Sequence, residues 1–214
     1  MKKLVVWALL VGCLLVCGCA RTVTQIVTYG DQLVVEVTLR GTLEVSANRY
    51  FLVIGTGEAF KVPLPPPDNI AYEFLEPGTT PLLGAIADYY TNYYYSWDGY
   101  VMTEPGGYFL VDGPFVLNQP TTRETLADLG TINNKVKFNL RLSQIFGNNV
   151  PDQIYFDFVT VNWPVANAKM SADHLASTNA YISKNAGSNI TVTDEDNPAL
   201  PAALDIRECK VTIQ

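Results

Sequence analysis

Two segments of the chain alternate apolar and polar residues with a period of two. Successive side chains of a β-strand point to opposite faces, so each segment presents one apolar face and one largely polar face. Strands of this kind are typical of antiparallel sheets that pack one face on a core and leave the other in water. The apolar positions are Leu33, Val35, Val37 and Leu39 in the first segment, and Val136, Phe138, Leu140 and Leu142 in the second. We therefore predict antiparallel strands at 33–40 and 135–142.

Other strands are predicted from short apolar runs. Tyr50–Ile54 is continuously apolar and is closed by glycine, which indicates a central strand covered on both faces. Near the C terminus the apolar parity changes between Ile206 and Cys209, which indicates a β-bulge near Glu208. The remaining candidate strands are Phe60–Leu64, Ile70–Phe74, Phe109–Val111, Ile154–Trp163 and Ile190–Thr193.

Turn-forming Gly, Pro, Asn and Asp residues separate these runs, and no helical pattern alternates with them. This favours an all-β fold: a single antiparallel β-sandwich, jelly-roll or immunoglobulin-like, with a barrel as the nearest alternative. One or two short helices are expected in the connections. Thr121–Glu124 resembles a capping box that leads to Leu126 and Leu129, so we predict a short helix there.

Composition sets limits on size and partners. The 214 residues are 48% hydrophobic and 16% charged, enough to bury one sizeable core. Lys and Arg total 14 against 21 Asp and Glu, a formal charge of -7, which argues against nucleic acid as a partner.

The first residues have the layout of a secretory signal. Two lysines follow Met1, and Leu4–Val16 carries no charge. As a helix this run would span about 20 Å, short of the roughly 30 Å hydrocarbon core of a bilayer, so a permanent transmembrane helix is disfavoured.

The residues that follow, Val16-Cys17-Gly18-Cys19, resemble the lipobox of bacterial lipoproteins. The departure from that motif is Cys17, where Ala or Ser is commoner. Leu10-Val11-Gly12-Cys13 fits the motif too, but it leaves a shorter apolar run before the cut, so Cys19 is preferred as the lipidation site.

The resemblance implies that Cys19 is acylated, that the chain is cut before it, and that the protein is held at the membrane of a bacterial cell envelope by lipid. Ala20 is not the Asp that signals inner-membrane retention in enterobacterial members, so the outer membrane or cell surface is favoured. The expected organisation is a signal peptide at 1–18, a lipidated tether at 19–29, and one β-sandwich domain at 30–214.

No catalytic motif is recognisable, so we predict that the protein is not an enzyme. After processing at Cys19, Cys209 is the one thiol of the domain, which excludes an internal disulfide and leaves a buried core cysteine or a reactive thiol. His174 is the sole histidine and lies in a loop-like stretch, where a solvated side chain is expected. Paired carboxylates of a glycan hydrolase stay a weaker alternative.

Aromatic residues concentrate between Asp88 and Tyr100. Tyr and Trp combine a flat apolar face with a hydrogen-bonding edge, so the segment suits core packing or a recognition surface. In the second case a ligand would be bound by Tyr93, Tyr95, Trp97, Asp98 and Tyr100. The spacing fits a strand and a helix equally.

Thr193–Asn197 gathers oxygen ligands of the kind that Ca²⁺ prefers, which makes Asp194 and Asp196 candidate ligands of a structural Ca²⁺; a solvated acidic turn is the alternative, and no other cofactor is expected. Together these patterns indicate a non-catalytic lipoprotein for recognition, adhesion or envelope assembly, with an unknown protein or glycan as its partner. The alternative is a surface carbohydrate-binding module.

Overall fold

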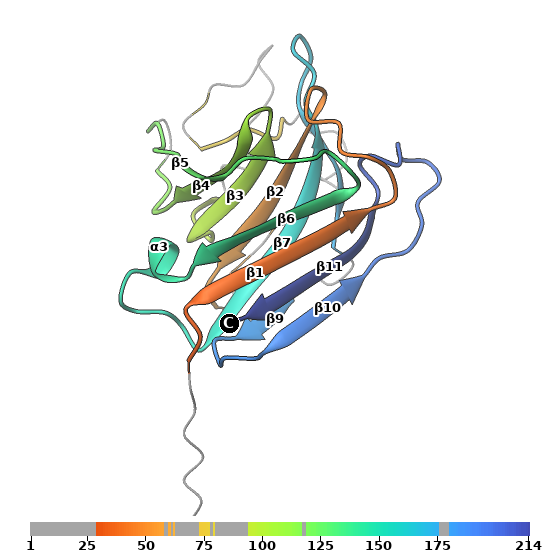
Figure 1. Cartoon of the computed structure of the whole chain (residues 1–214). Coiled ribbons are helices and arrows are strands. Elements are labelled where there is room, and N and C mark those ends of the chain that lie inside the picture. Colours follow the sequence, from red (N-terminus) through yellow and green to blue (C-terminus); the bar gives the residue numbers. More distant parts are fainter. Residues whose placement is uncertain are drawn as a thin grey trace, which may run out of the picture.

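The computed structural model describes residues 29–57, 60, 62, 73–77, 79, 94–116, 119–175 and 180–214. In this part of the chain nearly all regular structure is β-strand, arranged as two antiparallel sheets packed face to face (Figure 1). The expected all-β sandwich is confirmed. None of the helices described is long and apolar enough to cross a membrane.

The smaller sheet contains both strands with the clearest alternation. Its order is β10-β11-β1-β6, with β1 antiparallel to both of its neighbours. Every second residue of β1 and β6 is buried, as the period of two predicts. The strands are β1 (Gln32–Leu39), β6 (Lys135–Arg141), β10 (Asn189–Thr193) and β11 (Ile206–Ile213).

The larger sheet has the order β5-β4-β3-β2-β7-β8, and β9 also pairs with β7. β2 lies inside this sheet, and six consecutive residues from Tyr50 to Gly55 are buried, so the prediction of a strand covered on both faces is confirmed. The strands are β2 (Asn48–Gly55), β3 (Gly99–Glu104), β4 (Gly107–Asp112), β5 (Glu124–Ala127), β7 (Gln153–Asn162), β8 (Met170–His174) and β9 (Tyr181–Ser183).

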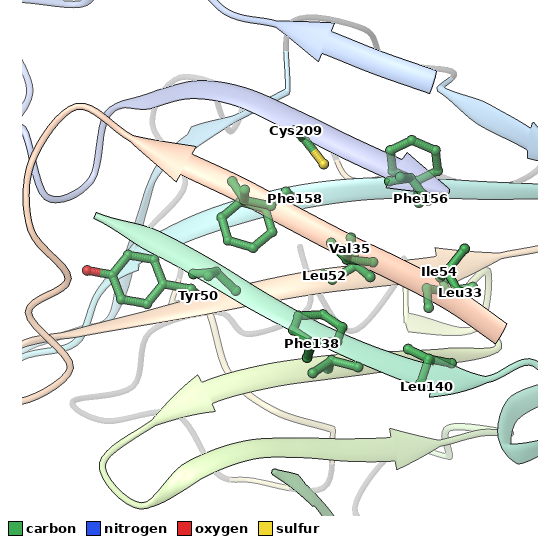
Figure 2. Packing of buried hydrophobic residues seen from close by; sticks show 14 of the residues in the cluster. Leu33, Val35, Tyr50, Leu52, Ile54, Phe138, Leu140, Phe156, Phe158 and Cys209 are labelled. Carbon is green, nitrogen blue, oxygen red and sulfur yellow. The ribbon is translucent and has the colours of Figure 1, made fainter. Parts of the chain in front are cut away.

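The main core lies between the sheets and is built from alternate residues of facing strands. Figure 2 shows Leu33 and Phe138 from the smaller sheet beside Leu52 and Phe158 from the larger one. Each of these four side chains is at most 5% exposed. Burial of large apolar side chains contributes about 1.5–3 kcal/mol each, so this layer is the main source of stability.

The predicted bulge in the last strand is confirmed. Thr38 pairs with Glu208 and Leu39 pairs with Ile206, so Arg207 is the extra residue. The bulge lets Ile206 and Cys209 both point into the core although they are three positions apart.

The predicted helix at Thr121–Leu129 is wrong. Residues Glu124–Ala127 form strand β5, which pairs with β4 at the edge of the larger sheet. The single turn of helix that the structure describes is α3 (Ser143–Phe146), between β6 and β7. Pairing with β4 provides backbone hydrogen bonds and outweighs the local capping signal, because a short isolated helix is marginal in water.

The sandwich has two distinct ends. At one, the backbone N–H groups of Asp31 and Gln32 both donate to the carbonyl of Gln214, at 3.0 and 3.2 Å, so the start of β1 lies beside the C terminus (Figure 1). We call this the entry end. The opposite end carries the connections 40–47, 163–169 and 194–205, and we call it the far end.

Tyr50 ties two far-end connections to the core. Its side chain is fully buried, and its hydroxyl accepts from the backbone N–H of Glu44 and donates to the carbonyl of Ala203, both at 3.0 Å. We predict that Tyr50→Phe lowers the free energy of unfolding by about 1–3 kcal/mol, because both buried backbone groups lose their partner. Urea unfolding measures this loss.

Tyr155→Phe is the matched control, because its hydroxyl donates to the exposed Gln153 side chain at 3.3 Å rather than to a buried backbone group. It should cost less than about 0.5 kcal/mol. Equal losses in the two variants would contradict the role assigned to Tyr50.

Candidate functional site

The outer face of the larger sheet carries a second apolar cluster. Residues of β2 and β7 that point away from the smaller sheet pack here against aromatic residues of other segments. Phe51 lies 4.8 Å from Phe74 and Tyr94 lies 4.8 Å from Trp97, measured between ring centroids. The larger sheet is therefore packed on both faces.

The structure places the predicted aromatic ligand residues in different environments. Trp97 and Tyr100 are only 3% and 1% exposed, because their rings belong to this second cluster. Tyr95 is 72% exposed, and Asp98 is half-buried. Tyr93 lies outside the described residues. The proposed four-ring binding platform thus needs correction, since the rings of Trp97 and Tyr100 face the core and cannot stack on a ligand from solvent.

The hydroxyl of Tyr100 belongs to a buried polar contact. It donates to Glu76 Oε2 at 3.1 Å, and the Arg123 guanidinium donates to Glu76 Oε1 at 2.5 Å. Burial, reinforced by the neighbouring Glu76 carboxylate, raises the pKa of Tyr100. Tyr100 is therefore a neutral donor under all ordinary conditions.

Further ion pairs continue from Arg123 along the surface, with acidic and basic side chains alternating. Arg123 also donates to Glu104 Oε1 at 2.8 Å, and Arg49 Nε lies 3.6 Å from Glu104 Oε2. The Arg49 guanidinium lies over the ring of Trp163, 5.6 Å from its centroid. Glu76 and Glu104 are thus two close carboxylates, as a hydrolase would require, but both are bound by one arginine.

Arg40 joins the acidic loop of the far end. Its Nε lies 3.1 Å from Asp205 Oδ2 and 3.4 Å from Asp196 Oδ1, and its guanidinium donates to the Asp194 carbonyl at 2.8 Å. The Asp194 carboxylate accepts from the backbone N–H of Glu195. Among the residues that the structure describes, no three His, Cys, Asp or Glu side chains converge as metal ligands. A Ca²⁺ ion at Asp194 and Asp196 stays a prediction.

His174 has a specific partner that the sequence did not reveal. Its Nδ1 lies 3.2 Å from Asp157 Oδ2, and the backbone N–H of Leu175 donates to Asp157 Oδ1 at 3.1 Å. The hydrogen bond that the imidazole makes to the Asp157 carboxylate raises the pKa of His174. The expectation of a solvated loop histidine is wrong, because His174 ends β8 and is half-buried.

Asp173, the neighbour of His174, is a second titratable group of this region. Its carboxylate accepts from the backbone N–H groups of His174 at 3.0 Å and Ile206 at 2.9 Å. Partial burial raises the pKa of Asp173 to about 6. An Asp–His pair can orient an imidazole as a general base. Here the Asp157–His174 pair joins β7 to β8, and Asp173 joins β8 to β11. These contacts hold three strands together, which is a structural role.

Cys209 is fully buried in the core between the sheets (Figure 2). By strand register His174 lies on the opposite face of the larger sheet, next to Val159. Burial raises the pKa of the Cys209 thiol, which keeps it protonated. The geometry therefore does not assemble a Cys–His pair from these two residues.

A groove of about 460 Å³ runs between β9 and β10 and is lined by 180–183 and 188–190. β10 is at the edge of the smaller sheet, and β9 pairs with β7 alone among the strands described. Within the described part of the chain the groove is bordered by two strand edges that pair with no further strand on that side, which is the geometry that accepts an extended segment of another chain.

Comparison with known proteins adds no relative: no protein-family model, no curated protein and no solved structure matches the chain.

Sequence reasoning did not find the buried ion pairs, although it had a usable signal. Glu73, Glu76 and Asp157 each interrupt an apolar run, and charged residues are almost never fully buried without a partner. Such positions predict a buried salt bridge. The partners Arg123 and His174 are 47 and 17 positions away, so their identity requires the fold.

The raised pKa of Asp173 predicts a pH-dependent stability. The folded protein holds this proton up to a pKa of about 6, whereas the unfolded chain releases it near the ordinary value of 3.8, so the contribution to stability falls as pH rises between these values. As pH rises from about 4 to about 7, the free energy of unfolding of Asp173→Asn should therefore increase by roughly 1 kcal/mol relative to that of wild type, after discounting for solvent screening.

Urea unfolding of both proteins at the two pH values tests this, with Asp128→Asn, at an exposed position, as the control. A constant difference between wild type and Asp173→Asn across this range would contradict the assignment.

The burial of Cys209 predicts an unreactive thiol. In the folded protein a maleimide should label it at least about a hundredfold more slowly than in urea, because the thiolate is disfavoured and the sulfur is covered. Peptide mass spectrometry measures this labelling. Lys210→Cys, at the next and exposed position of β11, is the control and should be labelled in the folded state. Equal labelling of the two cysteines would show that the core opens at β11.

Proposed function

We propose that the protein is a lipid-anchored, extracytoplasmic β-sandwich lipoprotein that acts without catalysis, in recognition, adhesion or envelope assembly. The observation that carries this proposal is the lipobox-like Val16-Cys17-Gly18-Cys19 behind an apolar run, placed ten residues before Tyr29. Tyr29 begins the described chain at one end of the sandwich, which is the arrangement expected of a domain carried on a short anchored segment.

The pairing of buried charges supports a non-catalytic role. Glu76 is held by Arg123, Asp205 by Arg40 and Asp157 by His174. Buried ions that are paired with each other stabilise a particular packing, whereas catalytic carboxylates face a substrate cleft. The Asp205–Arg40 pair holds the far-end connections together, whereas the Asp157–His174 pair joins β7 to β8 inside the larger sheet.

The exposed strand edges support recognition of another protein. The groove between β9 and β10 is bordered by two strands, and an exposed strand edge is a site where an extended segment of another protein can add. A glycan partner is less well supported, because Trp97 and Tyr100 are buried and two of the four proposed stacking rings are therefore covered.

The location follows from the same motif. The residue after Cys19 is Ala20 rather than Asp, which favours the outer membrane or the cell surface over the inner membrane. The processed chain loses two lysines and no acid, and its net charge becomes -7 - 2 = -9. Since anionic headgroups repel such a body, acyl chains rather than a basic patch would supply the anchor.

Acylation tests the proposal directly. Expressed in a bacterial host fed with an alkyne analogue of palmitate, wild type should incorporate label and co-float with membranes, because several acyl chains give stable anchoring. Cys19→Ser should lose both label and flotation by at least about tenfold.

Cys13→Ser is the matched control, since it removes the alternative lipobox cysteine and leaves Cys19 in place. It should behave as wild type. Label that persists in Cys19→Ser and is lost in Cys13→Ser would move the anchor to Cys13, and an unlabelled wild-type chain would overturn the proposal.

A further inference from the structure

The exposed tyrosines of the described chain gather at the entry end. Tyr29, Tyr95 and Tyr181 are 60%, 72% and 47% exposed, whereas the other tyrosines that the structure describes are buried or half-buried. We call these three residues the entry-end tyrosines. They come from separate parts of the chain, so no local sequence feature brings them to one end.

Tyr29 and Tyr181 both lie at β9. The Lys184 ammonium lies over the ring of Tyr29, 4.5 Å from its centroid, and Lys184 follows directly after β9. Tyr181 begins β9, and its ring lies 5.5 Å from that of Tyr155.

Tyr95 lies at the same end, next to the last residue of β2. Tyr155 pairs with Gly55 at the end of β2. Gly55 lies directly against the carbonyl of Ser96, because a Cβ added at Gly55 would meet that oxygen at 2.8 Å. Tyr95 precedes Ser96, so all three entry-end tyrosines lie around the same ends of β2, β7 and β9.

The opposite end exposes a different kind of side chain. Ile132, Val165 and Met170 are 51%, 95% and 37% exposed and lie in or beside the far-end connections. Val116, 47% exposed, follows β4, whose last residue Asp112 pairs with Gly99 at the entry end, so the separation along the long axis holds for the tyrosines and not for every aliphatic residue. This separation distinguishes the entry end from a surface with scattered apolar residues.

We infer that the entry-end tyrosines form a contact surface for the headgroup region of a lipid bilayer, an inference that rests on the proposed lipid anchor. Tyrosine is enriched at membrane–water interfaces because its ring enters the apolar boundary while its hydroxyl stays hydrated. The chain enters the sandwich at this same end, so an anchor at Cys19 directs these rings toward the bilayer.

The short segment between Cys19 and Tyr29 keeps the entry end close to the bilayer surface. Ten residue steps separate Cys19 from Tyr29, which limits the extended distance between them to about 36 Å. The far end is one strand length further away. Of the two ends, the entry end is therefore the one that the anchor holds within reach of the membrane.

Charge selects the kind of lipid that suits the entry end. Asp31 and Asp152 are exposed there, and Lys184 is paired with Asp152 at 2.8 Å. Arg141, opposite Gln32 at the start of β1, is exposed there too, so acids and bases are mixed at this end, and the acidic net charge of the whole chain is what disfavours anionic headgroups. The surface therefore fits zwitterionic lipid, and adding phosphatidylglycerol should weaken the contact.

Hydroxyl-radical footprinting of the full acylated protein in phosphatidylethanolamine–phosphatidylcholine vesicles tests the inference. The reference is the Cys19→Ser chain in solution with the same vesicles. Oxidation of Tyr29, Tyr95 and Tyr181 should fall by about threefold or more on the vesicles, because an interfacial contact excludes water from the rings. Met170, exposed at the far end, should be oxidised equally in both samples.

The outcomes separate this inference from the proposed function. If wild type does not float with vesicles, the anchor itself fails. If it floats but the three tyrosines are oxidised as in Cys19→Ser, the anchor stands and the contact surface is overturned. Equal protection of the tyrosines and Met170 would indicate self-association and would also overturn it.

A pair of matched variants gives a second readout. Trypsin can release the anchored domain by cutting after Arg21, and docking of the entry end should slow this cut. Replacing Tyr29, Tyr95 and Tyr181 by Ser should speed release by about threefold, whereas replacing Ile132, Val165 and Met170 by Ser should leave it unchanged. Equal rates in the two triple variants would contradict the inference.

Discussion

The pairing of β2 with β7 is the contact on which the rest of the structure depends. Their register runs from Asn48 with Asn162 to Gly55 with Tyr155, and the apolar residues of both strands point to both faces of the larger sheet. One face meets the smaller sheet, and the other would be exposed unless further chain covered it. The aromatic residues of the connection between β2 and β3 provide part of that cover. A strand pair with two apolar faces thus requires both cores, because each uncovered face would leave large apolar side chains in water.

Burying both faces also determines where charged residues can lie. Asp157 shares the outer face with Val159 and Val161, and taking its carboxylate out of water is costly unless it is paired. His174 meets that need from β8, and the backbone N–H of Leu175 satisfies the second oxygen. Glu76 is paired in the same way by Arg123 and Tyr100. These contacts are few, specific and made between distant segments, so they select one arrangement of the connections over the alternatives that apolar packing alone would allow.

The sequence predicted those parts of the fold that are determined locally. The alternation in β1 and β6, the two-sided burial of β2 and the bulge at Arg207 could all be predicted, because each is a relation between neighbours in the chain. The helix prediction at Thr121–Leu129 was wrong for the converse reason, since β5 exists through pairing with β4. The aromatic run was ambiguous because ring burial depends on what covers the larger sheet. Asp157 and His174 could not be paired, because only the β7–β8 register brings them together.

The two ends of the sandwich differ because strand ends are where the chain is free of the core. At the far end, long connections carry acids that Arg40 and Arg123 bind, and these arginines reduce the charge that an acidic chain would otherwise concentrate there. At the entry end the long 56–98 connection joins β2 to β3, and the start of β1 is joined to the C terminus through Gln214. Both ends are nevertheless held by backbone hydrogen bonds and by ion pairs, since Gly41 donates to the Ala202 carbonyl at the far end and Lys184 is paired with Asp152 at the entry end. The ends differ in the side chains that they expose, and the exposed tyrosines make the entry end the one that suits an apolar boundary.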